Sequence, residues 1–188
     1  MAWLILLAGP NGAGKSTTAR TVLRDLPIID TDAIAAGLRR RDPAASSIVA
    51  GRKSLQRISR SFARRRSFAV ETTLSGAGPL RRVRAAKNAG WNVAVVYVGL
   101  ADADLAVLRV RSRVAAGGHG VPESDIRRRY RRSLDNLPAA CRLADIGLTF
   151  DNSGPPGEMR LLARLARSRL AWAAPQPPEW AKRALARL

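Results

Sequence analysis

The sequence has 188 residues, a length that favours one domain over two. With 46% hydrophobic and 25% charged residues, its composition excludes disordered, collagen-like and coiled-coil proteins. The single cysteine, Cys141, excludes an intramolecular disulfide and a cysteine-rich zinc site. We expect Cys141 to be a small buried apolar residue.

The formal net charge is +19, and all but four of the 33 cations are arginines. Such a field attracts nucleic acid, anionic membranes or phosphorylated metabolites. An abundance of alanine and arginine also follows from genomic base composition, in which case the arginines only solvate helix faces. The basic runs lack the interleaved aromatic residues that single-strand binders use for stacking. Charge alone therefore identifies no partner.

Short apolar runs alternate with helical stretches along the chain, which predicts an α/β fold. The strands are expected at 3–8, 28–29, 68–70, 93–98 and 146–150. The helices are expected at 15–24, 45–65, 79–88, 102–115 and 123–134. This alternation predicts a three-layer sandwich in which helices cover both faces of a five-stranded parallel sheet. The expected strand order is 2-3-1-4-5.

A turn-rich segment at 151–157 separates the main domain, 1–153, from a C-terminal helical appendix, 154–188. The appendix is expected to hold a basic helix at 158–172 and a short helix at 180–188, without being an independent domain. Its docking face is expected to comprise Trp172, Trp180, Leu185 and Leu188. No apolar run approaches the roughly 20 residues of a membrane span, and 1–8 is too short for a signal peptide, so we expect a cytoplasmic protein.

The segment from Gly9 to Ser16 matches the phosphate-binding motif G-x-x-x-x-G-K-[ST] between a predicted strand and a predicted helix. Its backbone N–H groups would converge on the β-phosphate at the helix N-terminus. This nucleotide cradle is expected from Asn11, Gly12, Ala13, Gly14 and Lys15. Lys15 would bridge the β- and γ-phosphates, Ser16 would ligate Mg²⁺, and Thr17 would reach the α-phosphate.

Carboxylates follow the second and third predicted strands, where ligands of open α/β sheets bind. Asp32 is the expected general base that accepts a proton from an attacking hydroxyl, whereas Asp30 or Thr31 would cap the following helix. The third strand is followed by Glu71, Thr72 and Thr73. These side chains suit a polyhydroxylated acceptor or a water molecule of Mg²⁺, or a helix cap.

A lid is expected at about 109–135. Arg109 and Arg113 are four residues apart on one helix face, and a glycine-rich hinge that contains His119 follows them. Arginines on a closing lid stabilise the charge of a transferred phosphoryl group. We expect His119 to face the nucleotide, and most arginines of 127–132 to be solvated.

Together, these residues resemble the zeta-toxin-like P-loop kinases, in the branch labelled predicted ABC-type ATPases. The resemblance covers about residues 3–153 and is carried by GPNGAGKST, the Asp30-Thr31-Asp32 strand end, ETTLSG, RVRSRVAAGGHGVP, RRRYRRSL and FDNS. It implies an ATP- or GTP-dependent phosphotransferase, whose best-known relatives phosphorylate UDP-N-acetylglucosamine. Ala33 and Ile34 stand where those toxins carry an aromatic residue and an arginine.

The resemblance also implies roles for single residues. Lys15, Ser16 and Thr17 would hold nucleotide and Mg²⁺, and Asp32 would be the base. Glu71 and Thr73 would contact the acceptor, Arg109 or Arg113 would stabilise the transferred phosphoryl group, and His119 would lie in the lid.

The leading hypothesis is thus a kinase of a small hydroxylated acceptor. The first candidate acceptor is a UDP-amino sugar, and the second is another hydroxylated metabolite or an antibiotic. An antitoxin protein is a candidate partner. Two alternatives remain, a nucleotide-dependent nucleic-acid-binding ATPase and a nucleotide-dependent regulatory switch.

Overall fold

The computed structural model describes residues 1–40, 47–155 and 157–187. The described strands are β1 (Trp3–Ala8), β2 (Ile28–Asp30), β3 (Phe68–Thr72), β4 (Asn92–Gly99), β5 (Ile146–Asp151), β6 (Arg160–Ala166) and β7 (Arg169–Ala173). The described helices are α1 (Lys15–Val22), α2 (Thr31–Arg39), α3 (Ser47–Ala63), α4 (Ala77–Asn88), α5 (Ala103–Ala115), α6 (Glu123–Leu143) and α7 (Glu179–Leu185). The predicted helix at 45–65 begins on two residues outside the described part.

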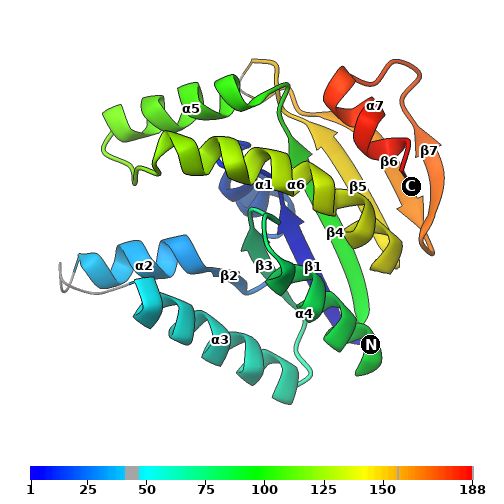
Figure 1. Cartoon of the computed structure of the whole chain (residues 1–188). Helices are drawn as coiled ribbons and strands as arrows, with labels where there is room; N and C mark the ends of the chain where they lie inside the picture. Colours follow the sequence, from blue (N-terminus) through cyan, green and yellow to red (C-terminus); the bar gives the residue numbers. More distant parts are fainter. Residues whose placement is uncertain (41–46, 156, 188) are drawn as a thin grey trace.

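The strands form one sheet in the order β2-β3-β1-β4-β5-β6-β7 (Figure 1). The first five strands are parallel and have the predicted order. In this register Leu7 of β1 lies beside Glu71 of β3. The carboxyl ends of β1, β2 and β3, with the residues that follow them, therefore meet at one edge of the sheet.

The prediction of five strands and of a basic helix at 158–172 was wrong. That segment forms β6 and β7, which are antiparallel to their neighbours and make the sheet mixed. The two residues between them, Arg167 and Ser168, have φ values of 50° and 64°. Positive φ at both central positions matches the right-handed twist of a two-residue hairpin, so the chain turns back as strands. Of the predicted appendix, only α7 is helical.

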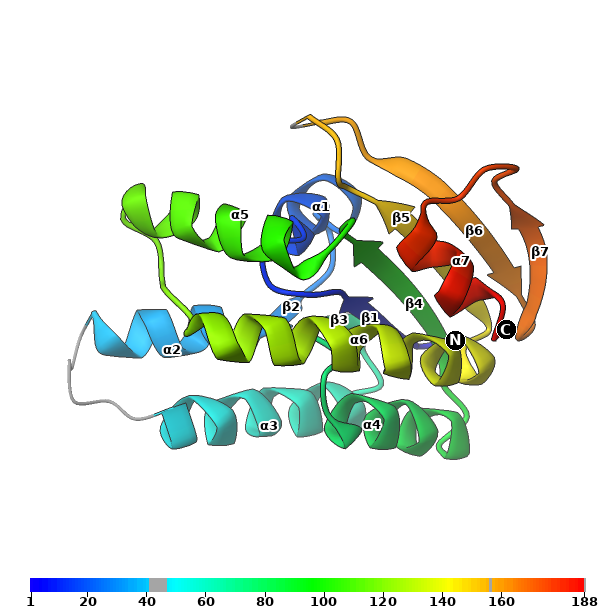
Figure 2. The ribbon, with the colours of Figure 1, turned by 45° about the horizontal axis from the view of Figure 1, so that its top comes forward.

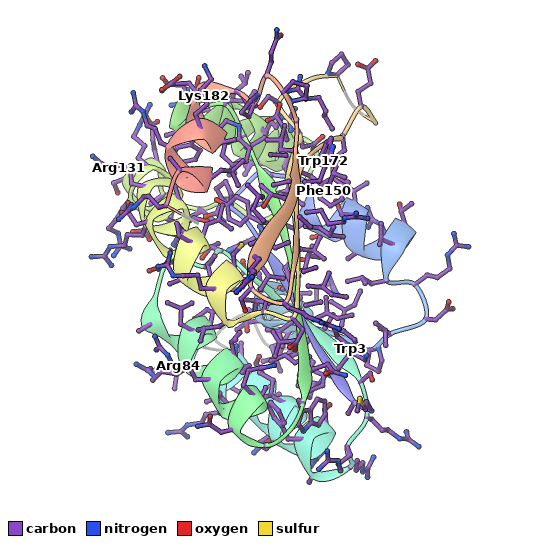
Figure 3. The ribbon with its side chains drawn as sticks, turned by 90° about the vertical axis from the view of Figure 1, so that its right-hand side faces the viewer. Trp3, Arg84, Arg131, Phe150, Trp172 and Lys182 are labelled. Carbon is purple, nitrogen blue, oxygen red and sulfur yellow. The ribbon has the colours of Figure 1, made fainter. Side chains whose placement is uncertain are left out.

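Helices cover both faces of the sheet, and Figure 3 shows the sheet nearly edge-on between them. Alternate residues of β1 point to opposite faces, because side chains alternate along a strand. Leu4 and Leu6 pack with α3, α4, α6 and α7, whereas Leu7 packs with α1, α5 and the start of α6. Figure 2 shows α5 and α6 joined by the loop of the predicted lid. The predicted three layers are confirmed.

The C-terminal helix docks on the ends of β4 and β5 through Trp180, which is 5% exposed. A Cβ atom on Gly99 would lie 2.1 Å from the Trp180 ring, so the close contact requires glycine there. The indole N–H donates to Asp151 Oδ1 at 3.1 Å. Trp172, in contrast, is 43% exposed and does not dock, which corrects its predicted role, and Leu188 lies outside the described residues.

Helix α6 continues to Leu143, past the predicted end at residue 134, although Pro138 lies within it. Cys141 on this helix is fully buried, as predicted. None of the helices in the described ranges has the length and hydropathy that crossing a membrane requires.

Candidate active site

The glycine loop between β1 and α1 needs glycine at positions where a side chain would not fit. Gly9 has a φ of 143°, and a Cβ atom there would lie 2.1 Å from the carbonyl oxygen of Val98. Gly12 and Gly14 also have positive φ values, 76° and 85°. Gly14 precedes α1 and supplies no side-chain cap, so the first N–H groups of α1 stay available to an anion.

Lys15 begins α1 with a side chain that is only 7% exposed. Its Nζ donates to the Pro10 carbonyl at 2.8 Å and lies 3.9 Å from Glu71 Oε1. Burial lowers the pKa of Lys15, and the negative charge of Glu71 opposes that shift. The loop therefore holds a poorly solvated cation whose charge can be balanced by phosphate oxygens.

Glu71 follows the buried part of β3 and faces the start of α1. Ser16 Oγ lies within hydrogen-bond distance of both carboxylate oxygens, 3.2 Å from Oε1 and 3.1 Å from Oε2, and donates to them. Burial raises the pKa of Glu71, against the opposing effect of Lys15. The hydroxyl and carboxylate oxygens are ligands of the type that Mg²⁺ prefers. These residues fit a Mg²⁺ ion bound beside the phosphates.

The two aspartates after β2 have different surroundings. Asp30 caps α2, because its Oδ1 accepts hydrogen bonds from the backbone N–H groups of Asp32 and Ala33 at 2.8 and 3.2 Å. Thr31 Oγ1 donates to Ser54 Oγ at 2.9 Å. The Asp32 carboxylate accepts no hydrogen bond from any described residue, yet it lines the same pocket as Lys15. Asp32 is thus available to a ligand, whereas Asp30 already has a structural role.

The threonines after Glu71 are partly engaged within their own loop. Thr72 Oγ1 accepts from the N–H of Leu74 at 3.0 Å, and Thr73 Oγ1 lies 2.9 Å from Ser75 Oγ. Leu74 has a positive φ of 56°, and Asn136 donates to its carbonyl oxygen. The loop is therefore fixed against α6 while both threonines line the pocket.

The predicted lid arginines also line this pocket, but His119 does not. Arg109 donates to the Gly154 carbonyl at 3.0 Å, and Arg113 donates to the His119 carbonyl at 2.6 Å. The His119 side chain is exposed, and its contact with nucleotide stays a prediction. The Ala13 side chain is buried, and its carbonyl accepts a hydrogen bond from the Asn152 side chain at 2.9 Å.

The pocket at this edge of the sheet has a volume of about 510 Å³, a size typical of small-ligand sites. It brings together the predicted lining residues Asn11, Gly12, Gly14, Lys15, Ser16, Thr17, Asp32, Glu71, Thr72, Thr73, Arg109 and Arg113. Asn11 Oδ1 is buried without a hydrogen-bond partner among the described residues. The donors and glycine cradle fit a nucleotide phosphate chain.

Sequence reasoning missed three residues of this site. Arg20 of α1 and Arg129 of α6 line the pocket, and Asn152 holds the glycine loop from the end of β5. Asn152 lies in the FDNS segment that contributes to the family resemblance, and only this membership pointed to a role in the site. Nothing in the sequence separates Arg129 from the neighbouring arginines.

Comparison with known proteins agrees with this geometry. Residues 4–136 match the family described as AAA domain. The chain is also similar to an uncharacterized protein of Haemophilus influenzae, with 34% identity over 128 residues, 67% of this chain and 91% of that protein.

Several solved structures have a similar fold. A chain of the AvrRxo1-ORF1:AvrRxo1-ORF2 complex with sulphate ions matches with a TM-score of 0.65 and 16% identity over 99% of this chain. The present chain spans 63% of the length of that relative. The same complex solved with ATP gives a TM-score of 0.58 at 15% identity, again covering 99% of this chain and 63% of that chain.

Two shorter structures are covered more fully. A candidate kinase from Chloroflexus aurantiacus J-10-fl has a TM-score of 0.61 and 20% identity, with 84% of this chain and 91% of that chain covered. A chain of the PezAT toxin–antitoxin system of Streptococcus pneumoniae has a TM-score of 0.60 and 16% identity, with 100% and 85% covered. These likenesses show an α/β P-loop kinase-like fold. With the match to residues 4–136, the chain belongs to the AAA domain family.

Proposed function

We propose that this protein transfers the γ-phosphate of ATP or GTP to a hydroxyl group of a small acceptor. The observation that carries the proposal is the joint placement of Lys15 and Asp32 in one pocket. A glycine-loop cation alone suits any nucleotide-binding protein. The Asp32 carboxylate lines the same pocket as Lys15 and has no hydrogen-bond partner among the described residues. It can therefore take the proton of an acceptor hydroxyl.

The glycine loop and Lys15 would hold the phosphate chain, with Thr17 near the α-phosphate. The structure solved with ATP among the similar folds supports a nucleotide as ligand. Ser16 would ligate Mg²⁺ directly, and Glu71 would hold a water molecule of its coordination shell. When bound, Mg²⁺ supplies charge neutralisation on the β- and γ-phosphate oxygens.

In the proposed transfer, the acceptor oxygen forms a bond to the γ-phosphorus and its proton passes to Asp32. The bond between the γ-phosphorus and the β–γ bridging oxygen breaks, and the nucleoside diphosphate leaves. Arg109 and Arg113 would stabilise the charge on the transferred group, and Arg129, which lines the same pocket, would be a further cation for this role. Residues 109–135 would form the lid that excludes water during this step.

For the acceptor, Thr72, Thr73 and Glu71 provide hydrogen-bonding groups suited to a polyol. UDP-N-acetylglucosamine is the first compound to test, because of the zeta-toxin resemblance. The similarity to a chain of the PezAT toxin–antitoxin system motivates an antitoxin-like protein as a proposed partner.

The proposal is tested by incubating the protein with γ-labelled ATP or GTP, Mg²⁺ and a panel of acceptors. The panel contains UDP-N-acetylglucosamine, sugars, nucleosides and aminoglycosides. We expect a labelled organic product with the natural chain and none with Lys15→Ala. Release of free phosphate alone across the whole panel would contradict the transfer and favour a nucleotide-dependent ATPase or switch.

A further inference from the structure

We propose that a row of cations along α3 binds the phosphate backbone of a single-stranded nucleic acid. The row, named here the α3 stripe, consists of Lys53, Arg57, Arg60 and Arg64. This binding site goes beyond the phosphotransferase proposed above and does not depend on it.

The geometry of α3 places the four side chains in line. Their spacings of four, three and four residues return to the same helix face. All four residues are exposed. The last lies just after Ala63, but its N–H still donates to the Arg60 carbonyl at 3.1 Å, which extends the helical geometry to Arg64. The stripe is therefore about 16 Å long, with successive members about 4.5 to 6 Å apart along the axis.

The charges of the α3 stripe are not neutralised within the described part of the protein. No described carboxylate lies within ion-pair distance of any of its members. Residues 47–101 contain eleven cations and one acid, Glu71, which faces the nucleotide pocket. Figure 3 shows that Arg84 of α4 also points away from the sheet. This side of the molecule therefore carries exposed positive charge that an anionic partner can neutralise.

The arginines of α6 make a clear contrast. Arg127 pairs with Glu123 and Asp104, and Arg128 pairs with Asp125 at 2.6 Å. Arg131 and Arg132 of α6 are exposed and have no acidic partner among the described residues, so the charge of that helix is balanced only in part. On α3, none of the cations has a described acidic partner.

The shape of the stripe indicates which polyanion it fits. The four members of the α3 stripe lie in one line, which a single phosphate backbone can follow. Arg40 lines the same groove as Lys53 and Arg57, and Arg65 and Arg66 adjoin Arg64, so further cations flank the line at both ends. Phosphate contacts carry no base information, and the stripe has no aromatic side chain for stacking, so we expect little sequence preference. Lys53 and Arg57 also line a groove of about 380 Å³ that includes Asp30, which places one end of the stripe beside the nucleotide pocket.

The test is fluorescence anisotropy of a labelled single-stranded oligonucleotide, without nucleoside triphosphate and over a range of salt concentrations. Four phosphate contacts contribute about −2.8 to the slope of log affinity against log salt, or about 50-fold between about 50 and 200 mM. The variant with Gln at all four stripe positions should lose this contribution. The variant Arg57→Lys with Arg60→Lys and Arg64→Lys should keep it, because the charges remain.

The matched control removes the same net charge elsewhere, by Arg24→Gln, Arg164→Gln, Arg167→Gln and Arg169→Gln. These four residues are exposed and also lack a described ion-pair partner. The control variant should keep the contribution of the α3 stripe to the slope of log affinity against log salt. Equal slopes for the stripe variant and the natural chain, or equal losses for the stripe variant and the control, would overturn the proposal. Binding to anionic vesicles through the stripe with no binding of the oligonucleotide would do the same.

Discussion

The contact between Lys15 and Glu71 makes a quantitative prediction about the glycine loop before any ligand binds. Both side chains are largely buried, 7% and 13% exposed, and their charged atoms are 3.9 Å apart. At this distance two opposite charges interact by about 4 kcal/mol if the effective dielectric constant is about 20. Burial opposes the charge on each, since it lowers the pKa of Lys15 and raises the pKa of Glu71. The pair should thus be strongly coupled without contributing much net stability.

The perturbations are Lys15→Met, Glu71→Gln and the double variant, and the assay is urea unfolding of all four proteins at neutral pH without nucleotide. Glu71→Gln should stabilise the protein, because the raised pKa of Glu71 means that its anionic form is disfavoured on folding. Glu71→Gln should raise the free energy of unfolding by more in the Lys15→Met protein, because Glu71 has lost its cationic partner there. We expect a coupling free energy of about 2 to 4 kcal/mol.

The Lys87–Asp145 pair is the matched control. Its atoms are closer, at 2.6 Å, but the side chains are 36% and 32% exposed. Solvent screening should reduce its coupling to about 1 kcal/mol or less, and added salt should reduce it further. A coupling energy near zero for Lys15 and Glu71, or one smaller than that of the exposed pair, would refute the reasoning from burial.

Three further outcomes are expected. Gly9→Ala should destabilise the protein by about 3 kcal/mol or more in urea unfolding, since its Cβ atom would overlap the Val98 carbonyl; a change below about 1 kcal/mol would contradict this. Trp180→Phe should cost about 1 to 2 kcal/mol through the lost hydrogen bond to Asp151, and Trp180→Ala about 3 to 5 kcal/mol, so equal costs would show that packing of the ring is unimportant. Burial raises the pKa of Cys141 from 9.0 to about 12, so stability should fall as the pH rises from about 9 toward 12, and iodoacetamide should label the thiol only after unfolding.

The parallel half of the fold was predictable because its strands are buried on both faces. Runs such as 93–98 are almost wholly apolar and end at glycine or polar residues, which identifies both the strand and its carboxyl end. The glycine loop then fixes where the first helix starts. The strand order could be expected only from the resemblance to P-loop kinases, since the sequence of β2 does not show that β3 lies between β2 and β1.

The C-terminal hairpin was not predictable for a local reason. Leucines at 161, 162 and 165, with arginines at 160, 164 and 167, follow a helical spacing. Two-residue hairpin turns usually contain Asn-Gly or Asp-Gly, because both central residues have positive φ. Here Arg167 and Ser168 occupy those positions, so the turn carries no sequence signal. Pairing of β6 with the edge of β5 outweighs the helical pattern.

At the site, sequence reasoning identified the residues whose chemistry is tied to a motif or to a strand end. It assigned the helix cap to Asp30 or Thr31 but could not choose between them, because the cap depends on the backbone geometry where β2 turns into α2. It also could not place Arg129, which the packing of α6 brings to the pocket, or show that Arg20 of α1 faces the pocket. The position of His119 depends on the loop between α5 and α6, which sequence spacing does not determine.

The central claim is that Asp32 acts in the transfer and not in binding the nucleotide. The most direct measurement is single-turnover transfer from γ-labelled ATP by Asp32→Asn, with nucleotide affinity measured on the same protein. Asp25→Asn serves as the control, an exposed aspartate outside the pocket. We expect Asp32→Asn to slow transfer by about 10²- to 10⁴-fold at unchanged nucleotide affinity, and Asp25→Asn to leave both unchanged. Transfer by Asp32→Asn at the rate of the natural chain would contradict the account.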